Sequence, residues 1–134
     1  MTSHAPPVRH ARSRWTALGL ALLVTAAGAS GARAARGYVL PDHSDPRAGA
    51  TLDTSPNVIR VWFEARIVQS LSTIRVEKAG GGQVDRADGH VDRQNPKLLE
   101  VTVPWLLAGK YRVFWSVVGA TGRRSSGDFP FRVR

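Results

Sequence analysis

The chain has 134 residues, of which 43% are hydrophobic and 22% charged, and it contains no cysteine. Its 19 Lys and Arg residues outnumber its 10 Asp and Glu residues, for a formal net charge of +9. This length suits a single domain with or without a short appendage. The absence of cysteine excludes a disulfide scaffold, a thiolate zinc site and an iron–sulfur cluster. The hydrophobic fraction is too high for a disordered chain.

The positive charge is unevenly distributed. The first 34 residues carry four arginines and no acidic residue, which leaves 15 basic and 10 acidic side chains from Ala35 onward. In that larger part the arginines stand singly among acids, and no basic run alternates with exposed aromatic residues. We therefore expect no nucleic-acid partner.

Residues 1–34 are predicted to be a secretory signal peptide. A basic, polar head (Met1–Arg14) precedes an uncharged Leu- and Ala-rich stretch (Trp15–Gly28), and Ala32-Arg33-Ala34 matches the Ala-x-Ala cleavage pattern. The alternative is a retained membrane anchor, because the uncharged stretch is near the lower length limit of a spanning helix. Cleavage after Ala34 leaves a domain without stable membrane insertion. Export places it in the periplasm or at another extracytoplasmic location.

The remaining residues, 35–134, are predicted to form one all-β domain. Apolar and polar residues alternate with period two, and turn residues separate the alternating segments. The five predicted principal strands are Val58–Phe63, Ser72–Lys78, Leu98–Val103, Lys110–Val118 and Phe129–Val133. Two further short strands are expected at Tyr38–Leu40 and Ala50–Leu52. This pattern predicts a seven-stranded antiparallel Greek-key β-sandwich, with a small barrel as the structural alternative.

The segment Lys110–Val118 predicts where the core lies. Tyr111, Val113, Trp115 and Val117 share one face of this strand, so we expect them to be buried. The aromatic residues Trp62, Phe63, Phe129 and Phe131 are also expected to pack in the core, whereas Trp105, in a Pro-Trp-Leu-Leu loop, is the expected exception. Pro130 cannot donate a backbone hydrogen bond, so its strand is predicted to be an edge strand.

Several motifs in this domain occur in the order and at the spacing seen in one known family. They are the run Asp42–Leu52, the strand end Val61-Trp62-Phe63, the segment Ala108–Val118 and the closing segment Gly127–Val133. Their order and spacing resemble the CopC family of bacterial exported copper-resistance proteins, and the resemblance covers Gly37 to Val133. It implies an immunoglobulin-like or cupredoxin-like sandwich that binds Cu(II) through nitrogen and oxygen donors, which suit this ion.

The resemblance also implies positions for the copper ligands. The N-terminal histidine of the family falls on Tyr38, and the family's Asp-x-His run falls on Thr121 and Arg123. An arginine side chain has no lone pair to offer a metal, and its charge repels a cation. Glu64 stands one residue before the position of an acidic residue in the family. The resemblance therefore implies a degenerate or relocated copper site.

With the family's ligand positions occupied by other residues, His43 and Glu64 are the candidate metal ligands of this domain. His43 stands beside Asp42 and Asp45, which together offer one nitrogen and two carboxylates, and Glu64 is the second candidate. The other histidine of the domain, His90, lies in an Asp-rich segment (Asp85–Asp92) that we interpret as a polar hairpin turn.

These observations favour an exported copper-binding or copper-resistance protein that carries or buffers Cu(II). A membrane copper transporter of the same system is its expected partner, and the protein is expected to be a monomer. The alternative is a metal-free interaction module of the cell envelope that presents Arg123 and Arg124 to a partner. No enzyme activity is expected, because the chain lacks a phosphate-binding loop and offers few bases to activate a serine.

Overall fold

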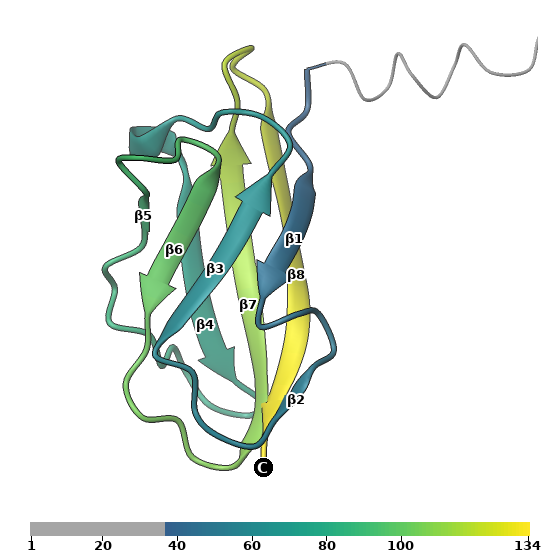
Figure 1. Cartoon of the computed structure of the whole chain (residues 1–134), viewed down its shortest axis with the longest axis vertical. Helices are drawn as coiled ribbons and strands as arrows, with labels where there is room; N and C mark the ends of the chain where they lie inside the picture. The colour runs from purple at the N-terminus through teal and green to yellow at the C-terminus, as the bar shows by residue number, and fades with distance from the viewer. Residues whose placement is uncertain (1–36) are drawn as a thin grey trace, which may run out of the picture.

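The computed structural model describes residues 37–134, which form two β-sheets packed face to face (Figure 1). The predicted signal peptide, residues 1–34 with cleavage after Ala34, lies outside the described residues. The strands are β1 (Pro41–Asp45), β2 (Thr51–Leu52), β3 (Val58–Phe63), β4 (Thr73–Lys78), β5 (His90–Val91), β6 (Leu98–Thr102), β7 (Gly109–Val118) and β8 (Arg124–Val133). A short 3-10 turn, η1 (Gln69–Leu71), precedes β4. Within residues 37–134, no helix has the length and apolar character needed to cross a membrane.

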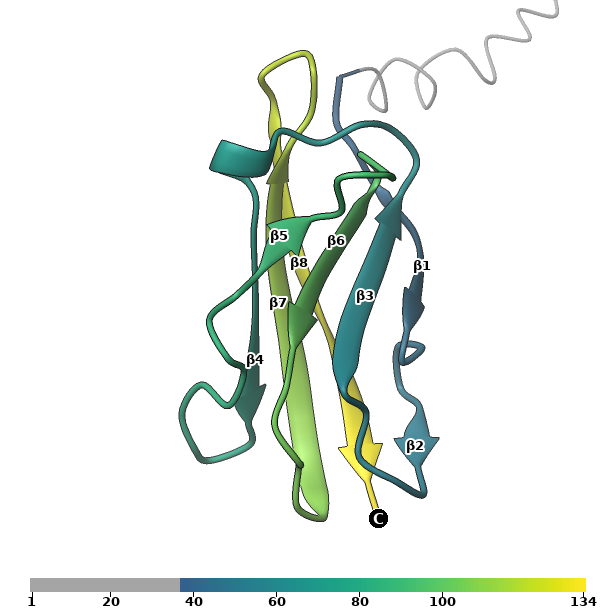
Figure 2. The ribbon, with the colours of Figure 1, turned by 60° about the vertical axis from the view of Figure 1, so that its left-hand side comes forward.

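The strand order confirms the predicted all-β sandwich. One sheet has the order β1-β3-β6-β5 and the other the order β2-β8-β7-β4. The connections from β3 to β4 and from β6 to β7 pass from one sheet to the other, and Figure 2 shows the two layers from the side. The β7–β8 turn lies at the same end of the sandwich as the start of the described chain (Figure 1).

The core lies between the two sheets and follows the predicted period of two. In β3, Ile59, Val61 and Phe63 are buried while the residues between them are half-buried. The four residues of β7 that were predicted to face the core are all buried: Tyr111, Val113, Trp115 and Val117. Burial of these apolar faces against each other is the main source of stability for a sandwich of this size.

Trp115 is buried between the two sheets. Its ring meets Phe63 edge-on with the ring centroids 5.3 Å apart. Gly127 is its partner on β8, and a Cβ atom there would lie 2.6 Å from Trp115 Cζ2. The indole therefore covers a position that has room only for glycine.

Residues 37–134 form eight strands rather than the seven predicted. The first strand is Pro41–Asp45 rather than Tyr38–Leu40, and β5 adds a strand at His90–Val91. Most residues of β1 are exposed, so this strand is held by pairing with β3 and shows no alternation of apolar residues. The two-residue β5 is likewise defined by its partner β6. Neither strand leaves a periodic pattern in the sequence.

The last strand is longer than predicted and one pairing is parallel. Strand β8 begins at Arg124 instead of Phe129, because β7 pairs with it over ten residues. The predicted sandwich was entirely antiparallel, whereas β2 runs parallel to β8 at Arg132 and Val133. The Pro130 carbonyl accepts a hydrogen bond from Gly49 N–H on the side away from β7. Strand β8 was predicted to be an edge strand because of Pro130, but it lies between β2 and β7. The proline is tolerated there because its nitrogen faces away from β7, so it removes no hydrogen bond from the β7–β8 ladder.

Candidate functional site

The three positions at which the resemblance places copper ligands lie together at one corner of the sandwich. Thr121, in the β7–β8 turn, donates a hydrogen bond from Oγ1 to the Gly37 carbonyl (2.6 Å). The Arg123 guanidinium lies over the Tyr38 ring, with its Cζ atom 5.3 Å from the ring centroid. The start of the domain is thereby fastened to the turn by one hydrogen bond and one cation–π contact.

This corner does not fit Cu(II). Arginine has no lone pair, and a threonine hydroxyl and a tyrosine phenol are poor donors for this ion. Glu64 lines the hollow beside Tyr38 and Thr121 and adds a single carboxylate. The Arg123 guanidinium adds a positive charge at the corner, and Arg66 lines the same hollow.

Gly37 is a part of the corner that reasoning from the sequence missed. Its φ is +104°, a value that favours glycine, and a Cβ atom on it would lie 2.8 Å from Arg123 Cδ. The aliphatic part of Arg123 therefore rests on the Gly37 backbone. A glycine directly before Tyr38 was the one hint of this close approach in the sequence.

His43 lies on β1, on the outer face of the β1-β3-β6-β5 sheet. It is the cross-strand partner of Trp62, and their rings are stacked with centroids 4.4 Å apart and planes 11° from parallel. Trp62 faces outward because its neighbours Val61 and Phe63 face the core. We had expected Trp62 in the core, and instead it forms a platform for the imidazole.

The hydrogen bonding of His43 leaves one ring nitrogen available. A carboxylate can only accept, so Nδ1–H donates to Asp42 Oδ2 (2.8 Å). Within residues 37–134, Nε2 has no hydrogen-bond partner, and 57% of the side chain is exposed. Metal-binding histidines commonly have this arrangement, because a bond at one ring nitrogen orients the lone pair of the other.

Glu64 and His43, the two candidate ligands, line one shallow hollow. Asp42, Trp62 and Lys97 contribute to the same hollow. Nevertheless, no group of three or more His, Asp or Glu side chains in residues 37–134 is close enough to hold a metal ion. Asp45, the third member of the predicted donor set, is paired with Arg60 in the β1–β3 register and does not line this hollow.

Residues 42–134 match the family model of the CopC domain. The chain belongs to the CopC family. The copper transport protein CutJ of Bacillus subtilis (strain 168) is 27% identical to it over 123 residues, which are 91% of this chain and 22% of CutJ. The chain thus spans about a fifth of the length of that curated relative.

Solved structures confirm the CopC fold. CopC from Methylosinus trichosporium OB3b superposes with a TM-score of 0.67 at 22% identity, covering 72% of this chain and 93% of that one. PcoC, a methionine-rich copper resistance protein from Escherichia coli, superposes with a TM-score of 0.66 at 21% identity, covering 72% and 99%. The family resemblance and the predicted sandwich are both confirmed.

The Asp-rich segment of this CopC domain shapes loops. Asp85 accepts backbone hydrogen bonds from Val76 and Ala87, and Asp92 accepts one from Asn95. Asp88 accepts two from Thr102, one from the side chain and one from the backbone, and these bonds lower the pKa of its carboxyl group. These carboxylates satisfy backbone N–H groups, which explains an acidic run that resembles a chelating site in the sequence.

His90 is bound within the same CopC domain at both ring nitrogens. Nδ1 lies 2.8 Å from the Asp88 carbonyl oxygen, and Nε2 lies 3.1 Å from Glu100 Oε1. Glu100 also accepts a hydrogen bond from Arg60 (3.1 Å). His90 therefore offers no free nitrogen, in contrast to His43. It belongs to β5 rather than to the predicted hairpin turn.

Proposed function

We propose that this chain is an exported copper-handling protein of the CopC type, which carries or buffers Cu(II) in the periplasm through a relocated site at His43. The supporting observation is the imidazole of His43, stacked on Trp62 and oriented by Asp42 with Nε2 directed away from its hydrogen bond. Imidazole nitrogen is a good donor for Cu(II), and carboxylate oxygens suit its tetragonal coordination. The signal-like pattern of residues 1–34 supports export.

The exposure of this site suits exchange rather than storage. One imidazole, with Glu64 as a carboxylate across the same hollow, leaves the other coordination positions of Cu(II) to water. A site with few protein ligands binds weakly and releases its ion readily. That behaviour fits a protein that passes copper on.

The first test is a Cu(II) titration of the exported protein, followed by tryptophan fluorescence and electron paramagnetic resonance. Cu(II) at His43 quenches Trp62 strongly, because the two rings are in contact. We expect His43→Ala to abolish both the saturable quenching and the spectrum of bound copper. Glu64→Gln should weaken binding while leaving it detectable.

Two matched variants make this test specific. His90→Ala removes the other histidine of the domain, whose ring nitrogens are both engaged, and should leave copper binding unchanged. Trp62→Phe should remove most of the quenching while the paramagnetic spectrum persists. Copper binding that survives in His43→Ala would refute a site at this histidine.

We also propose that the protein is a monomer that works with a membrane copper transporter. The similarity to CutJ, a copper transport protein of which this chain matches 22%, supports a partner of that kind. Strands β2 and β5, at the ends of the two sheets, have only two residues each. These two edges offer little backbone for pairing between copies. The longer edge strands, β1 and β4, carry charged side chains such as Asp45 and Arg75, which disfavour such pairing and support a monomer.

One observation favours a second candidate function, a metal-free interaction module of the cell envelope. At the corner formed by Tyr38, Thr121 and Arg123, the domain presents the Arg123 guanidinium over the Tyr38 ring. A domain of this kind acts through contacts with a partner, and neither proposal requires enzyme activity.

Restoring metal donors at this corner tests the second candidate. We expect the double variant Thr121→Asp, Arg123→His to acquire a Cu(II) spectrum that persists when His43 is also changed to alanine. The physical reason is that a carboxylate and an imidazole would replace a hydroxyl and a cation on the same turn. Arg124→His, one position along, is the matched control and should acquire no such spectrum. If the double variant binds no copper, the corner differs from a copper site by more than these two side chains.

A further inference from the structure

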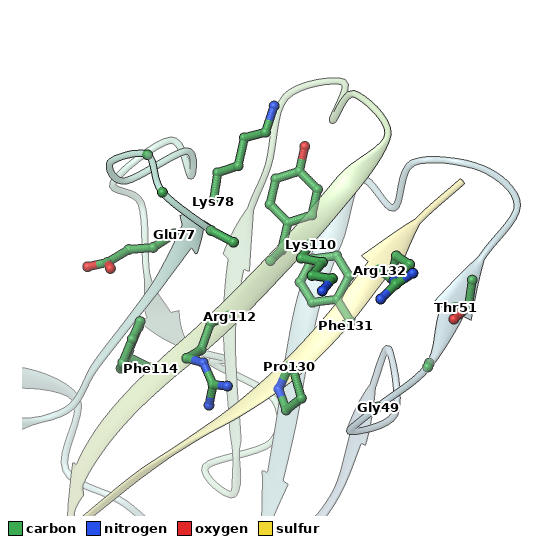
Figure 3. Close-up of a pocket in the computed structure, with 15 residues that line it drawn as sticks. Gly49, Thr51, Glu77, Lys78, Lys110, Arg112, Phe114, Pro130, Phe131 and Arg132 are labelled. Carbon is green, nitrogen blue, oxygen red and sulfur yellow. The ribbon is translucent and has the colours of Figure 1, made fainter.

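The outer face of the second sheet carries a hollow far from His43. Its floor is formed by outward-facing residues of β7 and β8, and its rims are the segment 49–51 and the turn 79–81 (Figure 3). Four cationic side chains and one carboxylate line it: Lys78, Lys110, Arg112, Arg132 and Glu77. We call this the basic hollow.

Two cations stand directly opposite each other in the basic hollow. Lys110 on β7 is the cross-strand partner of Arg132 on β8, and Figure 3 shows their side chains next to each other. Arg132 N–H donates to Ala50 on the other side, so Lys110 and Arg132 form a non-hydrogen-bonded pair. Side chains of such pairs approach most closely, and like charges placed there destabilise a sheet.

The acidic residues nearby are already engaged. Glu77 lies 3.3 Å from Arg75, and Asp128 is paired with Arg112. Among residues 37–134, no ion pair involves Lys78, Lys110 or Arg132. Lys78 is the cross-strand partner of the core-facing Tyr111, and its ammonium points away from the floor (Figure 3). The floor of the hollow therefore carries two positive charges, Lys110 and Arg132, that the described part of the chain does not neutralise.

We propose that the basic hollow binds an acidic, extended segment of a partner protein. Charge complementarity carries this assignment, since carboxylates between Lys110 and Arg132 would turn a repulsive pair into an attractive one. The floor also contains Phe114, which is half-buried, and Pro130, which is exposed. Apolar side chains among the cations favour a peptide over a small inorganic anion.

The shape of the hollow favours a protein segment over a membrane surface. Lys110, Arg112 and Arg132 lie on β7 and β8, and the segments 49–51 and 79–81 line the hollow on either side of them. A hollow bounded on two sides fits an extended chain better than a flat lipid surface. This interaction is independent of copper, so its test does not depend on the proposed function.

The experiment measures binding of a fluorescein-labelled peptide of alternating Glu and Ser to the exported protein by fluorescence anisotropy. We expect saturable binding that weakens as NaCl is raised. Lys110→Glu should weaken it about tenfold or more, because it removes one cation of the pair and adds a repulsive carboxylate. The same variant should raise Tm by about 1–5 °C, because it replaces a like-charge pair with an opposite-charge pair.

The matched control is Arg93→Glu, which makes the same charge change at an exposed residue that does not line the hollow. It should leave peptide binding nearly unchanged. The proposal is overturned if the peptide does not bind, or if Lys110→Glu binds it as tightly as the original protein. It is also overturned if the corresponding Gln-Ser peptide binds equally well, or if inorganic phosphate displaces the peptide at equal concentration. Binding to phosphatidylglycerol vesicles without binding to the peptide would assign the hollow to a lipid surface instead.

Discussion

Trp115→Ala should lower the free energy of unfolding by about 3–5 kcal/mol, the usual range for an aromatic residue truncated in a core. The Trp115 side chain lies between the sheets, meets Phe63 edge-on and covers Gly127. Because Gly127 has no side chain, nothing on β8 at that position can move in to fill the cavity. The sheet backbones are held by ten paired residues between β7 and β8, which also limits relaxation.

Denaturant unfolding followed by circular dichroism measures this effect, and Trp105→Ala is the control. Trp105 is 73% exposed, so its truncation should change the free energy of unfolding by less than about 0.5 kcal/mol. A loss below about 1 kcal/mol for Trp115→Ala would contradict its place in the core.

Gly119→Ala should lower the free energy of unfolding by about 1–3 kcal/mol, as expected when a methyl group is forced into a filled space. Gly119 is buried just after β7, and a Cβ atom there would lie 2.4 Å from Val39 Cγ2. Val39 is itself buried and directly follows Tyr38. The substitution therefore pushes the start of the domain away from the corner where Arg123 contacts Tyr38.

Gly82→Ala is the matched control for this prediction, because a Cβ atom at Gly82 meets nothing within 4 Å. We expect it to change stability by less than about 0.5 kcal/mol. Hydrogen exchange at residues 38–40 should also be faster in Gly119→Ala and unchanged in the control. Equal stability of the two variants would mean that Val39 moves aside without a loss of free energy, contrary to its packing in the core.

The strands that the sequence predicted well are those that bury one face. Residues Val58–Phe63 were predicted with the observed bounds, and β4, β6 and β7 agree within one residue at each end. In each of them, burial of every second side chain imposes an alternation that is visible without coordinates. The exposed Trp105 was also predicted correctly, because a proline-bounded loop interrupts that alternation.

The candidate site was predicted in part. The corner that brings together Tyr38, Thr121 and Arg123 was expected from the resemblance to the family, and the structure assembles it. The contact of Arg123 with the Gly37 backbone and the stacking of His43 on Trp62 were not expected. Each of these contacts joins segments that are distant in the sequence and have no shared periodicity.

The sequence by itself determined the all-β class, the core-facing side of the principal strands and the family, because these depend on local alternation and ordered motifs. Only the tertiary structure decided which polar side chains meet. It placed His43 on Trp62 through the β1–β3 register, and Lys110 against Arg132 through the β7–β8 register. Register is a property of two strands together, and shifting it by one residue would move every side chain of a strand to the other face. No single segment contains that information.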